Sequence, residues 1–77
     1  MENQQKALGI IANILDVDVG KLTLETAIQD TPDWDSGVFL AIVAELSEEF
    51  KLEIPIEQIM ELSKAKTIGE FLRLFGI

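Results

Sequence analysis

The sequence predicts an all-α protein, a four-helix bundle with a short third helix and a long first loop. Apolar residues recur at helical spacing near both ends of the chain, and an apolar segment without proline follows a polar turn near its middle. A chain of 77 residues has the size of one small domain, so we expect residues 1–77 to fold as a unit. The apolar fraction of 48% is too high for a disordered chain.

The first helix is predicted over residues 3–15, where Leu8, Ile11 and Leu15 fall on one face. Asn3 is a candidate cap for its first turn. Gly9 lowers the helix propensity by about 1 kcal/mol relative to Ala. We interpret it as a candidate point of close approach by another helix.

A loop is predicted over residues 16–35, which is long for a compact domain. We expect it to be ordered, because apolar residues along it can anchor it to the core. The expected anchors are Val17, Val19, Leu22, Leu24 and Ile28. Residues 25–28 favour a short helical turn. Pro32 and Asp33 favour a turn that keeps Thr31 out of a helix.

The second helix is predicted over residues 36–50. Asp35 is placed to cap it, because its carboxylate can accept from the free N–H groups of the first turn. Ser36 then occupies the first helical position, beside unpaired N–H groups that attract anions. The first half of this helix is apolar nearly all round, which predicts either burial on several sides or an apolar surface that contacts a partner.

Two shorter helices complete the bundle. Pro55 opens the third, which is predicted over residues 56–62. The fourth is predicted over residues 67–75, where Thr67 and Glu70 have the spacing of a capping box. Its expected core stripe is Ile68, Phe71, Leu72 and Phe75.

The composition excludes several functions. The chain has no cysteine and no histidine, so it can form no disulfide, no thiolate metal site and no Ser–His or Cys–His catalytic pair. Its net charge of −8 disfavours nucleic acid and favours partners with basic surfaces. No apolar stretch is long enough to span a membrane, and the N-terminus lacks the basic start of a secretory signal. We therefore expect a cytoplasmic protein.

Two loose groups of acidic residues are weak metal candidates. Asp30, Asp33 and Asp35 form one group, and Asp16 and Asp18 form the other. Neither stretch has the glycine and the glutamate that a calcium-binding EF-hand loop needs at its sixth and twelfth positions. We expect solvated acids and no metal site, so a calcium-binding helical domain is the weakest interpretation of this chain.

The chain resembles the acyl carrier protein family over nearly its whole length. The matching stretches are residues 11–18 (IANILDVD), 22–30 (LTLETAIQD), 35–36 (DS), 46–56 (LSEEFKLEIPI) and 67–75. In that family the serine of the Asp-Ser pair carries 4′-phosphopantetheine, which a phosphopantetheinyl transferase moves from coenzyme A with the help of a divalent metal. The resemblance implies that Ser36 is the attachment site, with Asp35 and Gly37 beside it as cofactor-binding residues.

The resemblance also implies a function. The chain is expected to be a monomeric carrier and not an enzyme, holding acyl groups as thioesters on the arm. It would shuttle them between acyl-loading and acyl-transferring enzymes of a fatty-acid, polyketide or other specialised pathway. Trp34 before the Asp-Ser pair looks like the stand-alone carriers of specialised pathways.

Two departures from the family concern partner docking. The family usually has Leu or Met after the serine, where this chain has Gly37. Where the family's second helix commonly has acids, this chain has Val38 and Ala41. We expect one of these two either to contact a partner enzyme or to be buried under the loop. The acids left to dock basic partner surfaces are Asp33, Asp35, Glu45, Glu48, Glu49, Glu53, Glu57 and Glu61.

One alternative belongs to a different class. The chain can also be interpreted as a small helical protein–protein interaction domain without a prosthetic group, in which Ser36 is only the serine that starts a helix. We expect most apolar residues of the helices to form an ordinary packed core rather than an acyl pocket, because protein interiors leave few voids.

Overall fold

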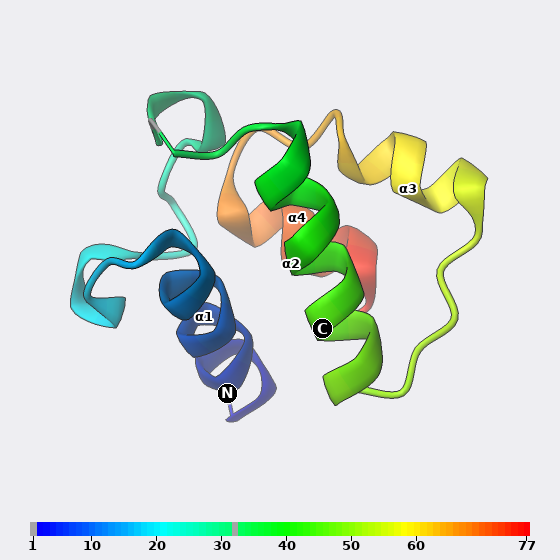
Figure 1. Cartoon of the computed structure of the whole chain (residues 1–77), viewed down its shortest axis with the longest axis horizontal. Helices are drawn as coiled ribbons and strands as arrows, with labels where there is room; N and C mark the ends of the chain where they lie inside the picture. The colour runs from blue at the N-terminus through cyan, green and yellow to red at the C-terminus, as the bar shows by residue number, and fades with distance from the viewer. Residues whose placement is uncertain (1, 32) are drawn as a thin grey trace.

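The computed structural model describes residues 2–31 and 33–77, and its elements confirm the all-α prediction for these residues. In chain order they are α1 (Glu2–Leu15), the 3-10 turns η1 (Val19–Lys21) and η2 (Ile28–Asp30), α2 (Ser36–Glu49), α3 (Ile56–Leu62) and α4 (Ile68–Phe75). Figure 1 shows α1 beside α2, with the short α3 at the far side of α2. Thr31 is extended as predicted, and Pro32 lies outside the described residues.

The core forms where α1, α2 and α4 meet. The four residues of the stripe predicted on α4 are at most 2% exposed, which confirms the helical spacing. Ile11 of α1 and both Ile42 and Leu46 of α2 are fully buried with them. None of the described helices is both long and apolar enough to cross a membrane.

Residues next to the helix ends cap α4 and terminate α2. The Thr67 hydroxyl accepts from the Glu70 N–H at 3.1 Å, as the capping box predicts. The Glu70 carboxylate accepts from the N–H of Lys66, one residue before the cap, at 2.8 Å. Lys51 follows α2 with φ 54°, a left-handed conformation that usually favours glycine. No glycine in the sequence marks that helix end.

The predicted helical turn at residues 25–28 is wrong in position. An isolated antiparallel bridge joins Ala27 to Thr67, and the Ile68 N–H donates to the Thr26 carbonyl at 3.1 Å. A tight turn closed by the bond from the Thr26 N–H to the Thr23 carbonyl, at 3.1 Å, covers residues 24 and 25. Ala27 is extended beside Thr67, so the 3-10 turn η2 begins only at Ile28. The long loop is thereby fastened to α4 through its backbone.

The expected anchors of the loop divide into two groups. Leu22 is buried, and Leu24 and Ile28 pack against the core, as predicted. Val17 and Val19 are 38% and 48% exposed, so the prediction for these two is wrong. Leu15 before them and Leu22 after them enter the core instead.

Two predictions for α1 are also wrong. The helix begins at Glu2, so Asn3 lies in its first turn and not at the cap position. A Cβ atom added to Gly9 would meet nothing within 4 Å, so no other helix approaches closely there. The close approach occurs at Gly69 in α4, where an added Cβ would lie 2.8 Å from the Leu24 carbonyl oxygen.

Candidate functional site

Ser36 is exposed at the first position of α2. Asp35 before it has the extended backbone of an N-cap residue, and its side chain accepts from the Val38 N–H at 2.8 Å. The Asp35 carbonyl accepts from the Phe39 N–H at 2.8 Å. The predicted cap is confirmed, and it fixes where α2 begins and where the serine hydroxyl is presented.

The start of α2 has the chemistry of an anion site. The N–H groups of Ser36 and Gly37 have no acceptor among the described residues, and a helix start carries partial positive charge. Gly37 places no side chain over them. The donors here suit an anionic group held on the Ser36 oxygen, because phosphate groups bind at helix starts in this way.

A hollow of ≈ 260 Å³ lies beside Ser36. Its lining residues are Ile28, Trp34, Asp35, Ser36, Phe39 and Ser63. The rings of Trp34 and Phe39 both stand edge-on to the ring of Phe71. The ring centroids are 5.5 Å apart for Trp34 and Phe71, and 6.0 Å apart for Phe39 and Phe71. Two aromatic rings that rest on the core therefore wall this hollow. Sequence reasoning did not find this hollow, because its lining residues come from the long loop, the start of α2 and the end of α3, which are far apart in the chain.

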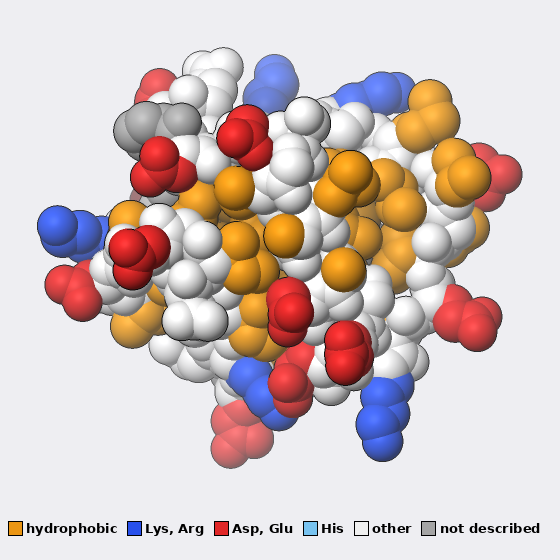
Figure 2. Space-filling model, viewed as in Figure 1, with side chains coloured by type: hydrophobic (Ala, Val, Ile, Leu, Met, Phe, Trp, Pro, Cys, Tyr) orange, Lys and Arg blue, Asp and Glu red, His pale blue; other side chains and the backbone are white. Residues whose placement is uncertain are grey.

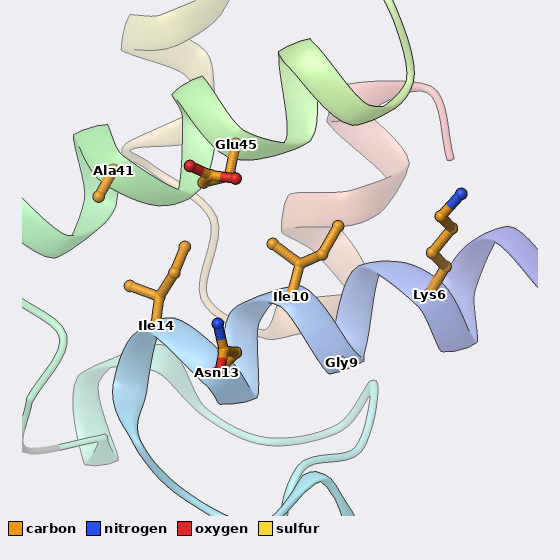
Figure 3. A pocket seen from close by; sticks show the side chains of 7 residues that line it. All are labelled: Lys6, Gly9, Ile10, Asn13, Ile14, Ala41 and Glu45. Carbon is orange, nitrogen blue, oxygen red and sulfur yellow. The ribbon is translucent and has the colours of Figure 1, made fainter.

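The predicted docking residues of α2 have different surroundings. Val38 is half-buried and packs against the core, whereas Ala41 is exposed. Ala41 and Glu45 line a groove of ≈ 440 Å³ between α1 and α2. Figure 3 shows Ile10 and Ile14 of α1 pointing toward α2 in this groove. The surface of α2 that faces α1 is thus partly apolar and partly acidic.

The other predicted docking acids are spread over α2 and α3. Glu48 is exposed near the end of α2, and Glu57 is exposed in the first turn of α3. Glu49 forms an ion pair with Lys6 of α1, with an N–O distance of 2.7 Å. Glu48 and Glu49 are thus neighbours on α2, whereas Glu57 belongs to α3.

The acidic groups of the loop do not gather around a common point. Within residues 2–31 and 33–77, no three His, Cys, Asp or Glu side chains are grouped closely enough to hold a metal ion. The Asp35 carboxylate accepts a hydrogen bond from the Val38 N–H, so it serves as the helix cap of α2.

A comparison with known protein families decides the identity. A family model described as the phosphopantetheine attachment site matches residues 5–74, a span that includes Ser36. The chain belongs to the phosphopantetheine-binding carrier family. The resemblance to acyl carrier proteins is confirmed, and the cofactor is 4′-phosphopantetheine, which this domain holds covalently. Carrier domains of this family are non-catalytic.

Sequence reasoning missed one surface of the carrier. Leu40 of α2 is 55% exposed, and Ile56 and Met60 of α3 are 74% and 60% exposed. Ile56 and Met60 are four residues apart and so lie on one side of α3, but only the tertiary structure shows that this side is uncovered. In the apolar first half of α2, Ile42 is buried in the core, whereas Leu40 is exposed on the surface.

Proposed function

We propose that Ser36 holds 4′-phosphopantetheine, and that the carrier shuttles acyl thioesters between enzymes of a fatty-acid, polyketide or other specialised pathway. The exposed Ser36 hydroxyl at the capped start of α2, within the matched span, carries this proposal. Other serines lack this setting. Ser47 is half-buried near the end of α2, and the Ser63 hydroxyl donates to the Met60 carbonyl at 2.6 Å.

The residues of the carrier have separate tasks in this proposal. The attached arm supplies a thiol, which the chain lacks because it has no cysteine. Asp35 holds the first turn of α2 in place, and the N–H groups of Ser36 and Gly37 are the donors available to a phosphate. Trp34 and Phe39 offer an apolar surface beside the attachment point.

The proposed partners are a phosphopantetheinyl transferase and the acyl-loading and acyl-transferring enzymes, which meet the monomeric carrier with basic surfaces. The net charge of −8 supports attraction to such surfaces over a distance. The residues proposed to face the partners are Val38, Ala41, Glu45, Glu48, Glu49 and Glu57. Their exposure supports this role for Ala41 and Glu45, which follow Ser36 along the same helix.

The attachment is tested by mass. The purified carrier is incubated with coenzyme A, magnesium and a broad-specificity phosphopantetheinyl transferase, and its intact mass is measured. We expect one phosphopantetheine group per chain, and none on a Ser36→Ala variant. A Ser63→Ala variant is the matched control, because Ser63 lines the same hollow; it should be modified like the wild type.

Two outcomes would contradict the proposal. An adduct that persists in the Ser36→Ala variant would place the arm on another residue. A wild-type chain that gains no adduct under conditions in which another carrier is fully modified would favour the interaction domain without a prosthetic group.

A further inference from the structure

We propose that the aromatic hollow beside Ser36 is a binding site for the root of the carrier's own arm. The occupant is the carbon atom with two methyl groups that follows the phosphate, and it rests on the rings of Trp34 and Phe39. The inference rests on the proposed function, because it requires the arm to be attached to Ser36. The filled hollow then sets the direction in which the arm leaves the serine.

The chemistry of the arm changes along its length. One methylene group after the phosphate comes a carbon atom that bears two methyl groups. A carbon atom with a hydroxyl group follows, and then two amides and the thiol. The dimethyl carbon is the most apolar part of the arm, and its short link to the phosphate keeps it close to Ser36. An apolar site for it must therefore lie directly beside the serine.

The hollow has that position. Phe39 comes three residues after Ser36, so the two side chains share one side of α2. Trp34 and Phe39 are both half-buried, and both rings stand edge-on to the fully buried ring of Phe71. Figure 2 shows hydrophobic side chains at the surface between the start of α2 and α3. The two rings thus keep uncovered apolar surface on a packed support, and burial of that surface is favourable.

The size and the edge of the hollow also fit the root of the arm. An apolar cavity of about 150 Å³ binds benzene, so a hollow of ≈ 260 Å³ has room for a branched alkyl group. Ser63 lines the hollow as well, and its hydroxyl donates to the Met60 carbonyl at 2.6 Å. Because that bond uses the only hydroxyl hydrogen, the Ser63 oxygen can accept from the hydroxyl group that follows the dimethyl carbon.

The fluorescence of Trp34 tests the inference, because Trp34 is the only tryptophan of the chain. Acrylamide quenching is measured on the unmodified carrier, on the carrier loaded from coenzyme A, and on the carrier loaded from an analogue in which hydrogens replace the two methyl groups. Intact mass confirms both loadings. The natural arm should lower the quenching constant by about twofold, because it covers the indole ring. The arm without methyl groups should leave the constant close to that of the unmodified carrier.

Nuclear magnetic resonance gives a second measurement. The methyl protons of the natural arm should show cross-relaxation with the indole protons of Trp34, and their signals should differ from those of the carrier unfolded in urea. Trp34→Leu should remove most of that difference. Phe50→Leu is the matched control, because Phe50 is a half-buried ring at the opposite end of α2; it should leave the difference unchanged. Circular dichroism checks that both variants keep their helices.

The outcomes separate this inference from the proposed function. A carrier that gains the arm but shows equal quenching with both arms would overturn the inference and leave the carrier function intact. Protection of Trp34 that grows with carrier concentration would also overturn it, since a second copy would then cover the ring. A wild-type chain that gains no arm would overturn both. The comparison of the two arms uses the wild-type chain, so it decides the matter even where Trp34→Leu fails to fold.

Discussion

At the scale of single residues, two glycines hold equivalent positions in different surroundings. Gly37 is the second residue of α2, and Gly69 is the second residue of α4. A Cβ on Gly37 would lie 3.4 Å from the Asp35 Oδ1 atom, an ordinary contact. A Cβ on Gly69 would lie 2.8 Å from the Leu24 carbonyl oxygen, which is too close. The fold therefore requires glycine at only one of the two positions.

Replacement of each glycine by alanine should have opposite effects on stability. Gly37→Ala should raise the free energy of unfolding by about 0.5–1 kcal/mol, because alanine restricts the unfolded chain and fits the helix. Gly69→Ala should lower it by about 1–3 kcal/mol, because the backbone must shift. Urea denaturation followed by circular dichroism measures both. A destabilised Gly37→Ala variant would show that the start of α2 needs the glycine.

At the scale of elements, the start of α2 is set by one side chain. Asp35→Ala should destabilise the carrier by about 1 kcal/mol, because the Val38 N–H loses its acceptor. Asp33→Ala is the matched control, because the Asp33 side chain makes no hydrogen bond to the described residues. Thermal unfolding compares the two variants. Equal melting temperatures would contradict the capping role. The Asp35→Ala carrier should also accept the arm more slowly, since Ser36 is then held less firmly.

At the scale of the whole molecule, the charges repel one another. The chain has 14 acidic and 6 basic residues, and the ion pair between Lys6 and Glu49 joins two exposed side chains. Ion pairs between exposed side chains contribute little to the free energy of unfolding, while excess charge of one sign destabilises a compact state. Salt should therefore stabilise this carrier.

The expected effect of salt is measurable. An increase from about 20 mM to about 500 mM NaCl should raise Tm by about 4 °C, which corresponds to roughly 1 kcal/mol in a domain of this size. A Glu48→Lys, Glu57→Lys variant has less net negative charge and should show a smaller rise. Calorimetry at both salt concentrations makes the comparison. A Tm that falls with salt would mean that attractive ion pairs outweigh the repulsion.

Features with local causes were predictable from the sequence. The stripe of α4, the cap formed by Asp35 and the exposed Ser36 all depend on residues within a few positions of one another. Helical spacing and capping bonds act over four residues or fewer. The sequence by itself therefore determined the helices and the serine presented at the start of α2.

Other features depended on contacts between distant segments. The bridge from Ala27 to Thr67 replaced a local helical turn, because backbone bonds to α4 outweighed a weak local preference. The aromatic hollow and the exposed side of α3 appear only when the loop, α2 and α3 are packed together. Only the tertiary structure decided which apolar residues stay uncovered, since burial is set by neighbours in space and not by neighbours in the chain.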